Sequence, residues 1–321
     1  MQISRIISAL AFSVTTLASA QSFNPSKAPM HIVVGYPAGG ATDLLARITA
    51  DSLSGKFQVP IIVDNKPGAN ANIAAELVAK SSPNGLTLCL CAINNAINQS
   101  LYRKLAFSFS SDLIPVAVFA RIPNILLVRN DLNVSNVGEL IELGRKKPGG
   151  LTYASTGSGS STHLSGALFG RASGLRLTHI PYKGSPSAIG GLLSGDVDML
   201  FDSATTALPA ARSGKVKALA TSGASRYRYA PELSTVAEAG LPGFEVSPWF
   251  GLFAPKGTDQ QIMASIGEAL KESLSDPEYV KRLGALGAEP VELSQDSSKQ
   301  FMRSEVMKWA DVIKDAQISV D

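Results

Sequence analysis

The sequence is poor in the features that mark metal, redox and membrane-spanning proteins. It has only two cysteines, Cys89 and Cys91, two positions apart in an apolar run. On a strand their side chains share one face, where a disulfide between them would be strained, so two buried thiols are the favoured interpretation. Beyond residue 20 no stretch reaches about 18 uninterrupted apolar residues, so no transmembrane helix is predicted. Nothing in the sequence predicts a metal ion or a cofactor.

Catalytic signatures are missing as well. There is no H-E-x-x-H motif, and no glycine turn is followed by the lysine and serine or threonine of a P-loop. A secreted serine hydrolase is an alternative, because the chain has many serines, three histidines and several aspartates. However, the serines of Gly157-Ser158-Gly159-Ser160-Ser161 stand at the wrong offset for a G-x-S-x-G elbow. The sequence therefore favours a protein that is not an enzyme.

Residues 1–20 have the form of a cleavable signal peptide. An early cation, Arg5, precedes an apolar run over residues 6–14, and Ala18-Ser19-Ala20 is a small-x-small cleavage site. No cysteine follows that site, so a lipid anchor on a new N-terminal cysteine is not expected. We expect an exported, soluble protein, which in a Gram-negative cell resides in the periplasm.

Charge and size narrow the range of partners. The formal net charge is +3, and it becomes +2 when Arg5 leaves with the signal peptide. Because the basic residues are scattered, neither nucleic acid nor an anionic membrane is an expected partner.

A chain of 321 residues that is 45% hydrophobic can bury a large core and suits two domains better than one. We expect a monomer.

Short apolar runs alternate with helical patterns, which predicts right-handed βαβ units around parallel sheets. The pattern restarts near Asn130, and the C-terminal segment is expected to return to the first domain. We predict an α/β fold of two domains, residues 28–128 plus 249–321 and residues 129–248, joined by two crossing strands. The predicted strands are 31–34, 60–63, 86–92, 116–119, 125–128, 151–154, 177–181, 197–201, 216–221 and 249–255, and the predicted helices are 44–55, 73–80, 137–147, 164–169, 187–194, 259–274, 277–286 and 295–316.

Two glycine-rich turns carry the chemistry. Residues 35–40 (Gly-Tyr-Pro-Ala-Gly-Gly) separate the first strand from a helix with good N-cap residues, Thr42 and Asp43. Such a turn leaves backbone N–H groups unpaired, lets an anion approach closely and adds the positive end of the helix dipole. Residues 155–163 form a second strand–glycine turn–helix unit. Ligands of open α/β sheets bind at the carboxyl ends of strands, so we expect a cleft with one anion-binding turn on each side, which holds a carboxylate.

The sequence resembles the Bug-type extracytoplasmic solute receptors, the binding components of tripartite tricarboxylate transporters. The resemblance is spread in order over nearly the whole mature chain and is specific for the family but silent on the ligand. It rests on the segments Tyr36-Pro37-Ala38-Gly39-Gly40-Ala41-Thr42-Asp43-Leu44-Leu45-Ala46-Arg47, Val63-Asp64-Asn65-Lys66-Pro67-Gly68-Ala69, residues 83–88, residues 153–164, His179-Ile180-Pro181-Tyr182-Lys183-Gly184 and residues 195–202.

This resemblance implies a periplasmic binding protein of the Venus-flytrap type, with each domain a mostly parallel sheet flanked by helices and a ligand cleft between them. It implies a small-molecule carboxylate ligand held between the two turns, partly through ordered waters. Matched by position, the implied binding residues are Tyr36, Ala38, Gly39, Gly40, Ala41, Thr42, Asp43, Thr156, Gly157, Ser158, Gly159, Ser160, Ser161 and His163, with Asp202 and Ser203 at a strand end that faces the cleft. Two departures are Gly35, where many relatives carry a bulkier or polar residue, and Asn70-Ala71-Asn72, which replaces a glycine-rich tail.

Several of these residues have competing interpretations. For Asp43 a role as a cap or loop brace is favoured over ligand contact, because its charge repels a carboxylate. His163, near a helix start that disfavours the imidazolium, either contacts the ligand as a neutral imidazole or braces the serine loop. Tyr182 either lines the pocket or belongs to the core, as does Trp249. Asn94 and Asn95 either bind the distal part of the ligand or are turn residues.

The predicted function is binding rather than chemistry. Neither turn contains lysine or arginine, so dipoles and hydrogen bonds from backbone N–H groups and hydroxyls are expected to replace water around the carboxylate. Domain closure would bury the ligand, because only the closed state makes both sets of contacts. The expected partners are membrane transporter subunits, with a sensor kinase as the alternative, since transport and sensing would use the same liganded form.

Overall fold

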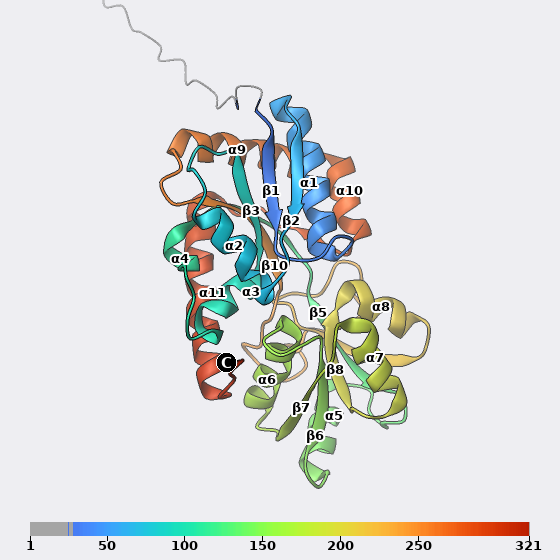
Figure 1. The fold of residues 1–321 in the computed structure, drawn as a ribbon. Coiled ribbons are helices and arrows are strands. Elements are labelled where there is room, and N and C mark those ends of the chain that lie inside the picture. The colour runs from blue at the N-terminus through green and yellow to red at the C-terminus, as the bar shows by residue number, and fades with distance from the viewer. Residues whose placement is uncertain (1–24, 26–27, 321) are drawn as a thin grey trace, which may run out of the picture.

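Two sheets covered by helices form two domains that lie end to end (Figure 1). This computed structural model describes residue 25 and residues 28–320, so the predicted signal peptide lies outside the described residues. The first sheet has six strands in the order β11-β4-β10-β3-β1-β2, and the second has five in the order β7-β6-β8-β5-β9. Parallel pairing joins β1 to β2 and β3, and β6 to β7 and β8, as the alternating pattern predicted.

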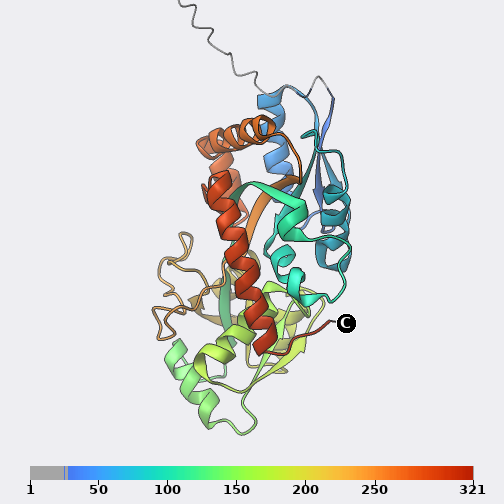
Figure 2. The same ribbon diagram turned by 90° about the vertical axis from the view of Figure 1, so that its left-hand side faces the viewer.

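The first domain contains both the N-terminal and the C-terminal segments of the described chain. Its helices lie on both faces of the first sheet (Figures 1 and 2). The elements are β1 (Met30–Val34), α1 (Ala41–Phe57), β2 (Ile61–Asn65), η1 (Ala69–Ala71), α2 (Asn72–Ala79), β3 (Thr87–Ala92), α3 (Ile93–Leu101), α4 (Phe109–Asp112), β4 (Leu113–Arg121), β10 (Trp249–Pro255), α9 (Gln260–Leu274), α10 (Pro277–Ala285), β11 (Glu289–Pro290) and α11 (Gln295–Asp315).

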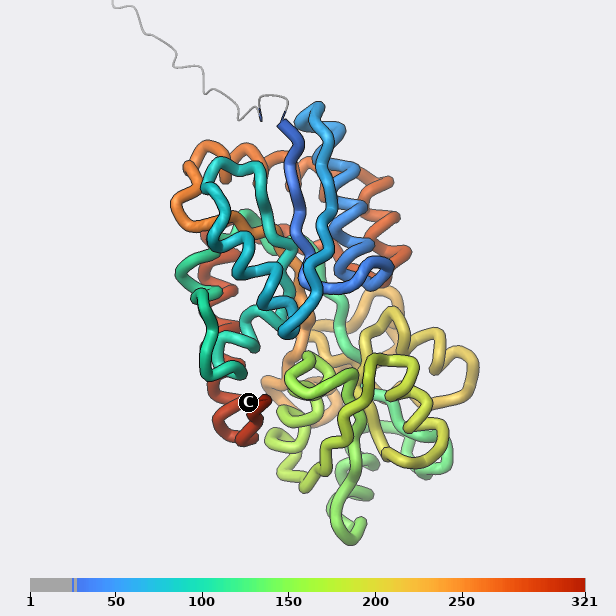
Figure 3. The backbone as a smooth tube through the Cα atoms, in the orientation of Figure 1, coloured from blue at the N-terminus to red at the C-terminus, as the bar shows by residue number. Residues whose placement is uncertain are grey.

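The second domain is one continuous stretch between the two crossings. Its elements are β5 (Asn124–Arg129), α5 (Val137–Lys146), β6 (Leu151–Ser155), α6 (Ser161–Ser173), β7 (Leu177–Pro181), α7 (Ser185–Ser194), β8 (Met199–Ser203), α8 (Ala204–Arg212) and β9 (Val216–Thr221). The backbone trace shows how residues 222–248 then lead back to the first sheet (Figure 3). Antiparallel pairs occur in both sheets: β10 is antiparallel to β3 and β4, β11 to β4, and β5 to β8 and β9.

The strand predicted at 125–128 belongs to the second sheet, which corrects its placement in the first domain. β5 is hydrogen-bonded to β8 and β9, so the chain changes sheets between Arg121 and Asn124 rather than after residue 128. β4 and β5 are apolar runs only two residues apart, and hydrophobicity alone does not say which core each one enters. At the crossings the backbone N–H of Ile122 donates to the carbonyl of Pro248 (2.9 Å), so the outgoing and returning segments run side by side.

Among the described residues the α-helices α3, α4 and α8 were not predicted, and α3 and α8 both begin at the ends of strands. α3 contains Asn94, Asn95 and Asn98, which are weak helix formers, yet it forms because Ile93, Ala96, Ile97 and Leu101 bury one face. α8 contains Pro209 and has threonines at its second and third positions, and it is held by buried Ala204, Ala207 and Leu208. Tertiary packing therefore overrides local propensity at both places.

The long C-terminal helix α11 is a third link between the domains. It packs against α3 and β4 of the first domain and reaches α6 of the second (Figure 2). Asp315 at its end forms an ion pair with Arg171 of α6 (2.9 Å). Glu305, buried near its middle, accepts hydrogen bonds from the indole N–H groups of Trp249 and Trp309 (3.0 Å each). Trp249 is therefore a core residue at the second crossing, not a pocket residue.

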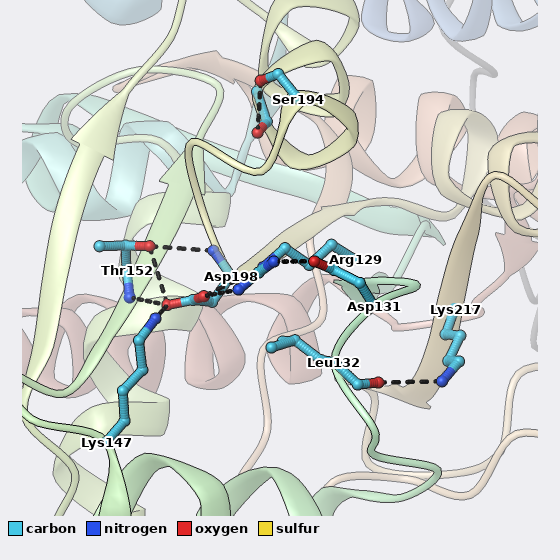
Figure 4. A network of polar contacts seen from close by, with 9 residues as sticks. Arg129, Asp131, Leu132, Lys147, Thr152, Ser194, Asp198 and Lys217 are labelled. Carbon is cyan, nitrogen blue, oxygen red and sulfur yellow. Dashed lines mark hydrogen bonds and ion pairs between the residues drawn. The ribbon is translucent and has the colours of Figure 1, made fainter.

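A buried charge cluster holds the far end of the second sheet together (Figure 4). Asp198, 2% exposed, accepts hydrogen bonds from Lys147 (2.5 Å), the side chain of Arg129 (3.2 Å), and both the backbone N–H and hydroxyl of Thr152. Burial alone would raise the pKa of Asp198, but these hydrogen bonds and the charge of Lys147 hold the pKa below its usual range. The cluster ties α5, β5, β6 and β8 together at the end of the sheet away from the first domain.

Candidate functional site

A cavity of about 450 Å³ lies between the two domains. The first domain contributes Tyr36 and the start of α1, and the second contributes the ends of β6 and β8. The crossing segments contribute Ile122 and Pro248, so the connection between the domains forms part of the wall. The lining residues are Tyr36, Gly40, Ala41, Thr42, Ala92, Ile93, Asn94, Ile122, Asn124, Thr156, Ser160, Ser161, Thr162, Gly184, Ser185, Asp202, Ser203, Pro248 and Phe250.

Helix N-termini surround this cavity. The first residues of α1, α3, α6 and α7 and the N-cap residue of α8, Ser203, all line it, so two helix starts come from the first domain and three from the second. Each helix start carries N–H groups that have no partner within the helix, together with the positive end of the helix dipole. The helix starts therefore supply positive partial charge to the cleft, although none of its described lining residues is cationic.

The capping of these helices differs from that of most helices elsewhere in the described chain. Away from the cleft, α5, α9, α10 and α11 are capped by the side chains of Asn136, Asp259, Asp276 and Ser294. At the cleft, the N-cap residues of α1, α3, α7 and α8 make no side-chain capping hydrogen bond, and only α6 has one, from Ser160 to the N–H of His163. α2 and α4 also lack a side-chain cap although they do not line the cavity. N–H groups that a cap would occupy are thus left available where a ligand can reach them.

Among the described residues that line the cavity, Asp202 is the only one with an ionisable acidic or basic side chain apart from Tyr36. No lysine, arginine or histidine is among these described lining residues. Asp202 is fully buried and accepts hydrogen bonds from Ser185 (2.6 Å) and Thr206 (2.5 Å). Burial raises the pKa of Asp202, and these hydroxyl hydrogen bonds only partly oppose that rise. Recognition of an anion here rests on N–H and hydroxyl donors.

Asp43 braces the first turn from behind. Its carboxylate accepts hydrogen bonds from the N–H of Gly39 (2.8 Å), from Arg47 (2.9 Å) and from Asn65 (2.9 Å), and it does not line the cavity. Burial alone would raise the pKa of Asp43, but these bonds and the charge of Arg47 hold the pKa below its usual value. The structure thus places Asp43 as a brace, the interpretation that the sequence favoured. Ala38 and Gly39 are exposed at the outer rim of the turn.

The second turn divides between cleft and scaffold. Thr156, Ser160 and Ser161 line the cavity, whereas Gly157, Ser158, Gly159 and His163 do not. Ser158 is exposed to solvent. Gly159 has a positive φ of 76° and faces the first domain, since a Cβ there would lie 2.3 Å from Leu101. Gly159 therefore allows close contact between the domains beside the cleft.

His163 supports the turn and lies outside the cleft. Its Nδ1 accepts a hydrogen bond from the N–H of Gly159 (3.0 Å), and its ring stacks on His179 at 3.7 Å between centroids. His179 in turn hydrogen-bonds the hydroxyl of Ser155 (2.7 Å). Burial, with the neighbouring His179, lowers the pKa of His163 to about 3, and burial lowers that of His179 to about 4. The pair is a neutral brace beneath the turn and borders a separate cavity of about 550 Å³ next to α6 and α11.

Of the other predicted binding residues, some line the cavity and one does not. Asn94 and Ser203 line the cavity, and burial raises the pKa of the Tyr36 hydroxyl, which also lines it. Tyr182 does not line it; the Tyr182 hydroxyl lies over Gly191 of α7, where a Cβ would come within 2.2 Å of it.

Sequence reasoning missed several lining residues: Ala92, Ile93, Ile122, Asn124, Thr162, Gly184, Ser185, Pro248 and Phe250. Four of them lie at the two crossings between the domains: Ile122, Asn124, Pro248 and Phe250. The sequence could have indicated these residues only through the places where one sheet's strands end and the other's begin. Gly184 and Ser185 open α7, and the small residues followed by Pro186 were the cue to an earlier helix start.

Comparisons with known proteins fit this architecture. Residues 45–318 match the model of the tripartite tricarboxylate transporter family receptor. The chain belongs to this family. It is 34% identical over 289 residues to protein BugT of Bordetella pertussis (strain Tohama I), covering 89% of each chain.

Solved structures of similar proteins have the same two-domain fold. A structure named R. palustris Rpa4515 with adipate is 34% identical, with a TM-score of 0.79 over 91% of this chain and 98% of the other. The periplasmic binding protein BugD is 32% identical, with a TM-score of 0.76 and the same coverage. The predicted fold class and the Bug-type resemblance are confirmed. The family consists of periplasmic solute-binding receptors, and none of the helices in residues 28–320 is long and apolar enough to cross a membrane.

Proposed function

We propose that this receptor binds a small carboxylated organic compound in the interdomain cleft and delivers it to a tripartite tricarboxylate-type membrane transporter. The observation that carries the proposal is the set of five helix N-termini, four of them without a cap from the N-cap side chain, around a cavity whose described lining residues include no cationic side chain. N–H groups at helix starts bind carboxylate and phosphate oxygens well. The adipate bound to a protein of 34% identity supports the carboxylate class.

The two domains have separate tasks in this proposal. The start of α1 offers the N–H groups of Ala41 and Thr42, and the start of α6 offers those of Ser161 and Thr162 together with the hydroxyl of Thr156. A carboxylate between the two starts makes both sets of contacts only when the domains are close, so the ligand selects the closed state. The transporter then recognises the closed form, in which both domains present one combined surface.

Native mass spectrometry of the purified protein, followed by a thermal-shift screen, tests this function. The screen compares small carboxylates with their methyl esters and amides, which keep the carbon skeleton but remove the negative charge. A ligand that binds only the folded state raises the unfolding temperature, so at least one carboxylate and not its ester is expected to do so. Stabilisation by none of the acids, or turnover of the esters, would overturn the proposal.

A further inference from the structure

The cleft-lining residue Asn94 belongs to a chain of asparagine side chains that begins at a backbone carbonyl. Asn98, fully buried, donates through Nδ2 to the backbone carbonyl of Asn70 (2.7 Å) and to Oδ1 of Asn72 (2.8 Å). Its Oδ1 accepts from Nδ2 of Asn70 (2.9 Å). Oδ1 of Asn70 then accepts from Nδ2 of Asn94 (2.7 Å).

This series of hydrogen bonds determines, for each asparagine, which neighbour its NH₂ faces and which its Oδ1 faces. A backbone carbonyl only accepts, so the group of Asn98 that meets it must be the NH₂, and Oδ1 of Asn98 must face Asn70. Asn70 must then present its own NH₂ to Asn98 and its Oδ1 to Asn94. Asn94 is left with one N–H of its NH₂ donated to Asn70 and with Oδ1 unpaired among the described residues, while the side chain lines the cavity. The cleft therefore presents a hydrogen-bond acceptor at this point.

The segment that carries Asn70 is built for this contact. Ala69, Asn70 and Ala71 all have left-handed backbone conformations, with φ of 46°, 52° and 74°, although none is glycine. Residue 35 accommodates the third of them, because a Cβ on Gly35 would lie 2.3 Å from the Cβ of Ala71. Gly35 and Asn70-Ala71-Asn72, the two departures from the family pattern noted above, are thus in contact. A side chain at position 70 is present at a place where glycine would be less strained, and that side chain orients Asn94.

We propose that Asn70 is a positioning residue that gives the cleft a preference for a carboxylate bearing a hydrogen-bond donor, a hydroxyl or an amine, at its other end. This inference rests on the proposed function. Oδ1 of Asn94 and the carboxylate of Asp202 are both acceptors on the cavity wall, one from each domain, so a ligand donor is paired by Oδ1 of Asn94. A second carboxylate would meet acceptors instead, with no lysine, arginine or histidine among the described lining residues to compensate.

Length-matched ligands test the preference. In calorimetry, 6-hydroxyhexanoate, hexanoate and adipate differ only in the group at the far end, and 4-hydroxybutyrate, butyrate and succinate repeat the comparison on a shorter chain. The hydroxy acid of at least one series is expected to bind about tenfold more tightly than its diacid, the effect of one good hydrogen bond against an unpaired one. Tighter binding of the diacids overturns the preference while upholding the carboxylate receptor; binding of none of the carboxylates tested here or in the thermal-shift screen overturns the proposed function itself.

A double-mutant cycle tests the role of Asn70. Asn70→Gly removes the side chain and suits the left-handed backbone, so it keeps the fold, and Asn94→Ala removes the acceptor. Each is expected to reduce the preference for the hydroxy acid about fivefold to tenfold, and the double variant to reduce it no further, because Asn70 acts only through Asn94. An exposed asparagine elsewhere, changed as Asn133→Gly, is the control. Unchanged selectivity in Asn70→Gly, or additive losses in the double variant, would refute the assignment.

Discussion

The two ends of strand β8 carry buried aspartates in opposite surroundings. Asp198, just before the strand, is bonded to Lys147, Arg129 and Thr152, and its pKa lies below the usual value. Asp202, four residues later at the cleft end, accepts hydrogen bonds from the hydroxyls of Ser185 and Thr206 and from the backbone of Ser203 but from no cation, and burial raises its pKa. The same sheet thus holds a neutralised charge at one end and an uncompensated one at the other.

The difference separates stability from binding. Cations at the far end tie four elements together, whereas the cleft end has none among its described lining residues and relies on helix N-termini. A lysine or arginine in the cleft would pair with Asp202 and occupy the space of the ligand. Without one, the only strong complement to the free N–H groups is an anion from solution.

Removal of the Asp198 carboxylate, at the end of the second sheet away from the cleft, should cause the largest loss of stability. Asp198→Ala leaves Lys147 and Arg129 without their buried partner, so the free energy of unfolding should fall by about 3 kcal/mol. Urea unfolding followed by circular dichroism measures this loss. Asp131→Ala, at an exposed partner of the same Arg129, is the matched control and should change stability by less than about 1 kcal/mol. Equal losses in the two variants would contradict the assigned role of the buried carboxylate.

At the cleft end, Gly40→Asp should abolish ligand binding while keeping the fold. A Cβ at Gly40 has room, since its nearest neighbour is 3.6 Å away, and φ is −78°. Aspartate is a good N-cap, so the unliganded protein should be at least as stable as the parent. The new carboxylate competes for the N–H groups and repels the ligand, so affinity should fall by at least about 100-fold.

The neutral variant Gly40→Asn separates charge from size in the same titration calorimetry. It caps the helix and has nearly the same volume, so its loss of affinity should be clearly smaller than that of Gly40→Asp. Wild-type affinity in Gly40→Asp would show that the ligand does not bind at the start of α1.

The two aspartates should give opposite pH dependences. The lowered pKa of Asp198 contributes stability that is present above the unfolded value of about 4 and is lost as the pH falls through the folded value. The raised pKa of Asp202 means that the folded state takes up a proton at a higher pH than the unfolded state does. The buried, ionised carboxylate therefore lowers the free energy of unfolding at neutral pH, and this destabilisation disappears as the pH falls toward about 4.

Urea titrations of the parent, Asp198→Asn and Asp202→Asn at several pH values between 3.5 and 7 check this. As the pH falls, the free energy of unfolding of the parent should decrease relative to that of Asp198→Asn. Relative to that of Asp202→Asn, it should increase. The same sign at both positions would contradict the contrast between the two ends of β8.

The histidine pair should leave binding insensitive to pH. Because the pKa values of His163 and His179 are about 3 and about 4, both rings stay neutral from pH 5 to 8 and the turn that they support is unchanged. In the Asp202→Asn background, which removes the acidic group of the cavity lining, affinity should therefore vary by less than about twofold over this range. Stability alone should decline below about pH 6.5, where the unfolded histidines take up protons that the folded rings do not. A transition in affinity near pH 6.5 would place a histidine in the site.

How far the sequence predicts this protein follows from the range of the interactions involved. Period-two and helical patterns located most elements, and the chemistry of the Gly39-Gly40 turn predicted where the cleft-lining start of α1 lies. Local patterns did not show that β5 changes sheets, because Ile125 to Val128 is equally apolar in either core. They also hid α3, whose asparagines disfavour a helix until Leu101 and its neighbours are packed. His163 was ambiguous because its neighbour His179 is sixteen residues away in sequence and in contact only after folding.

The most direct test of the account is a crystal structure of the protein with the carboxylate that stabilises it most. The account predicts carboxylate oxygens within hydrogen-bonding distance of backbone N–H groups at the starts of α1 and α6, with no lysine or arginine in contact. A carboxylate paired with a cationic side chain, or bound in the cavity beside α6 and α11 rather than between the domains, would contradict it.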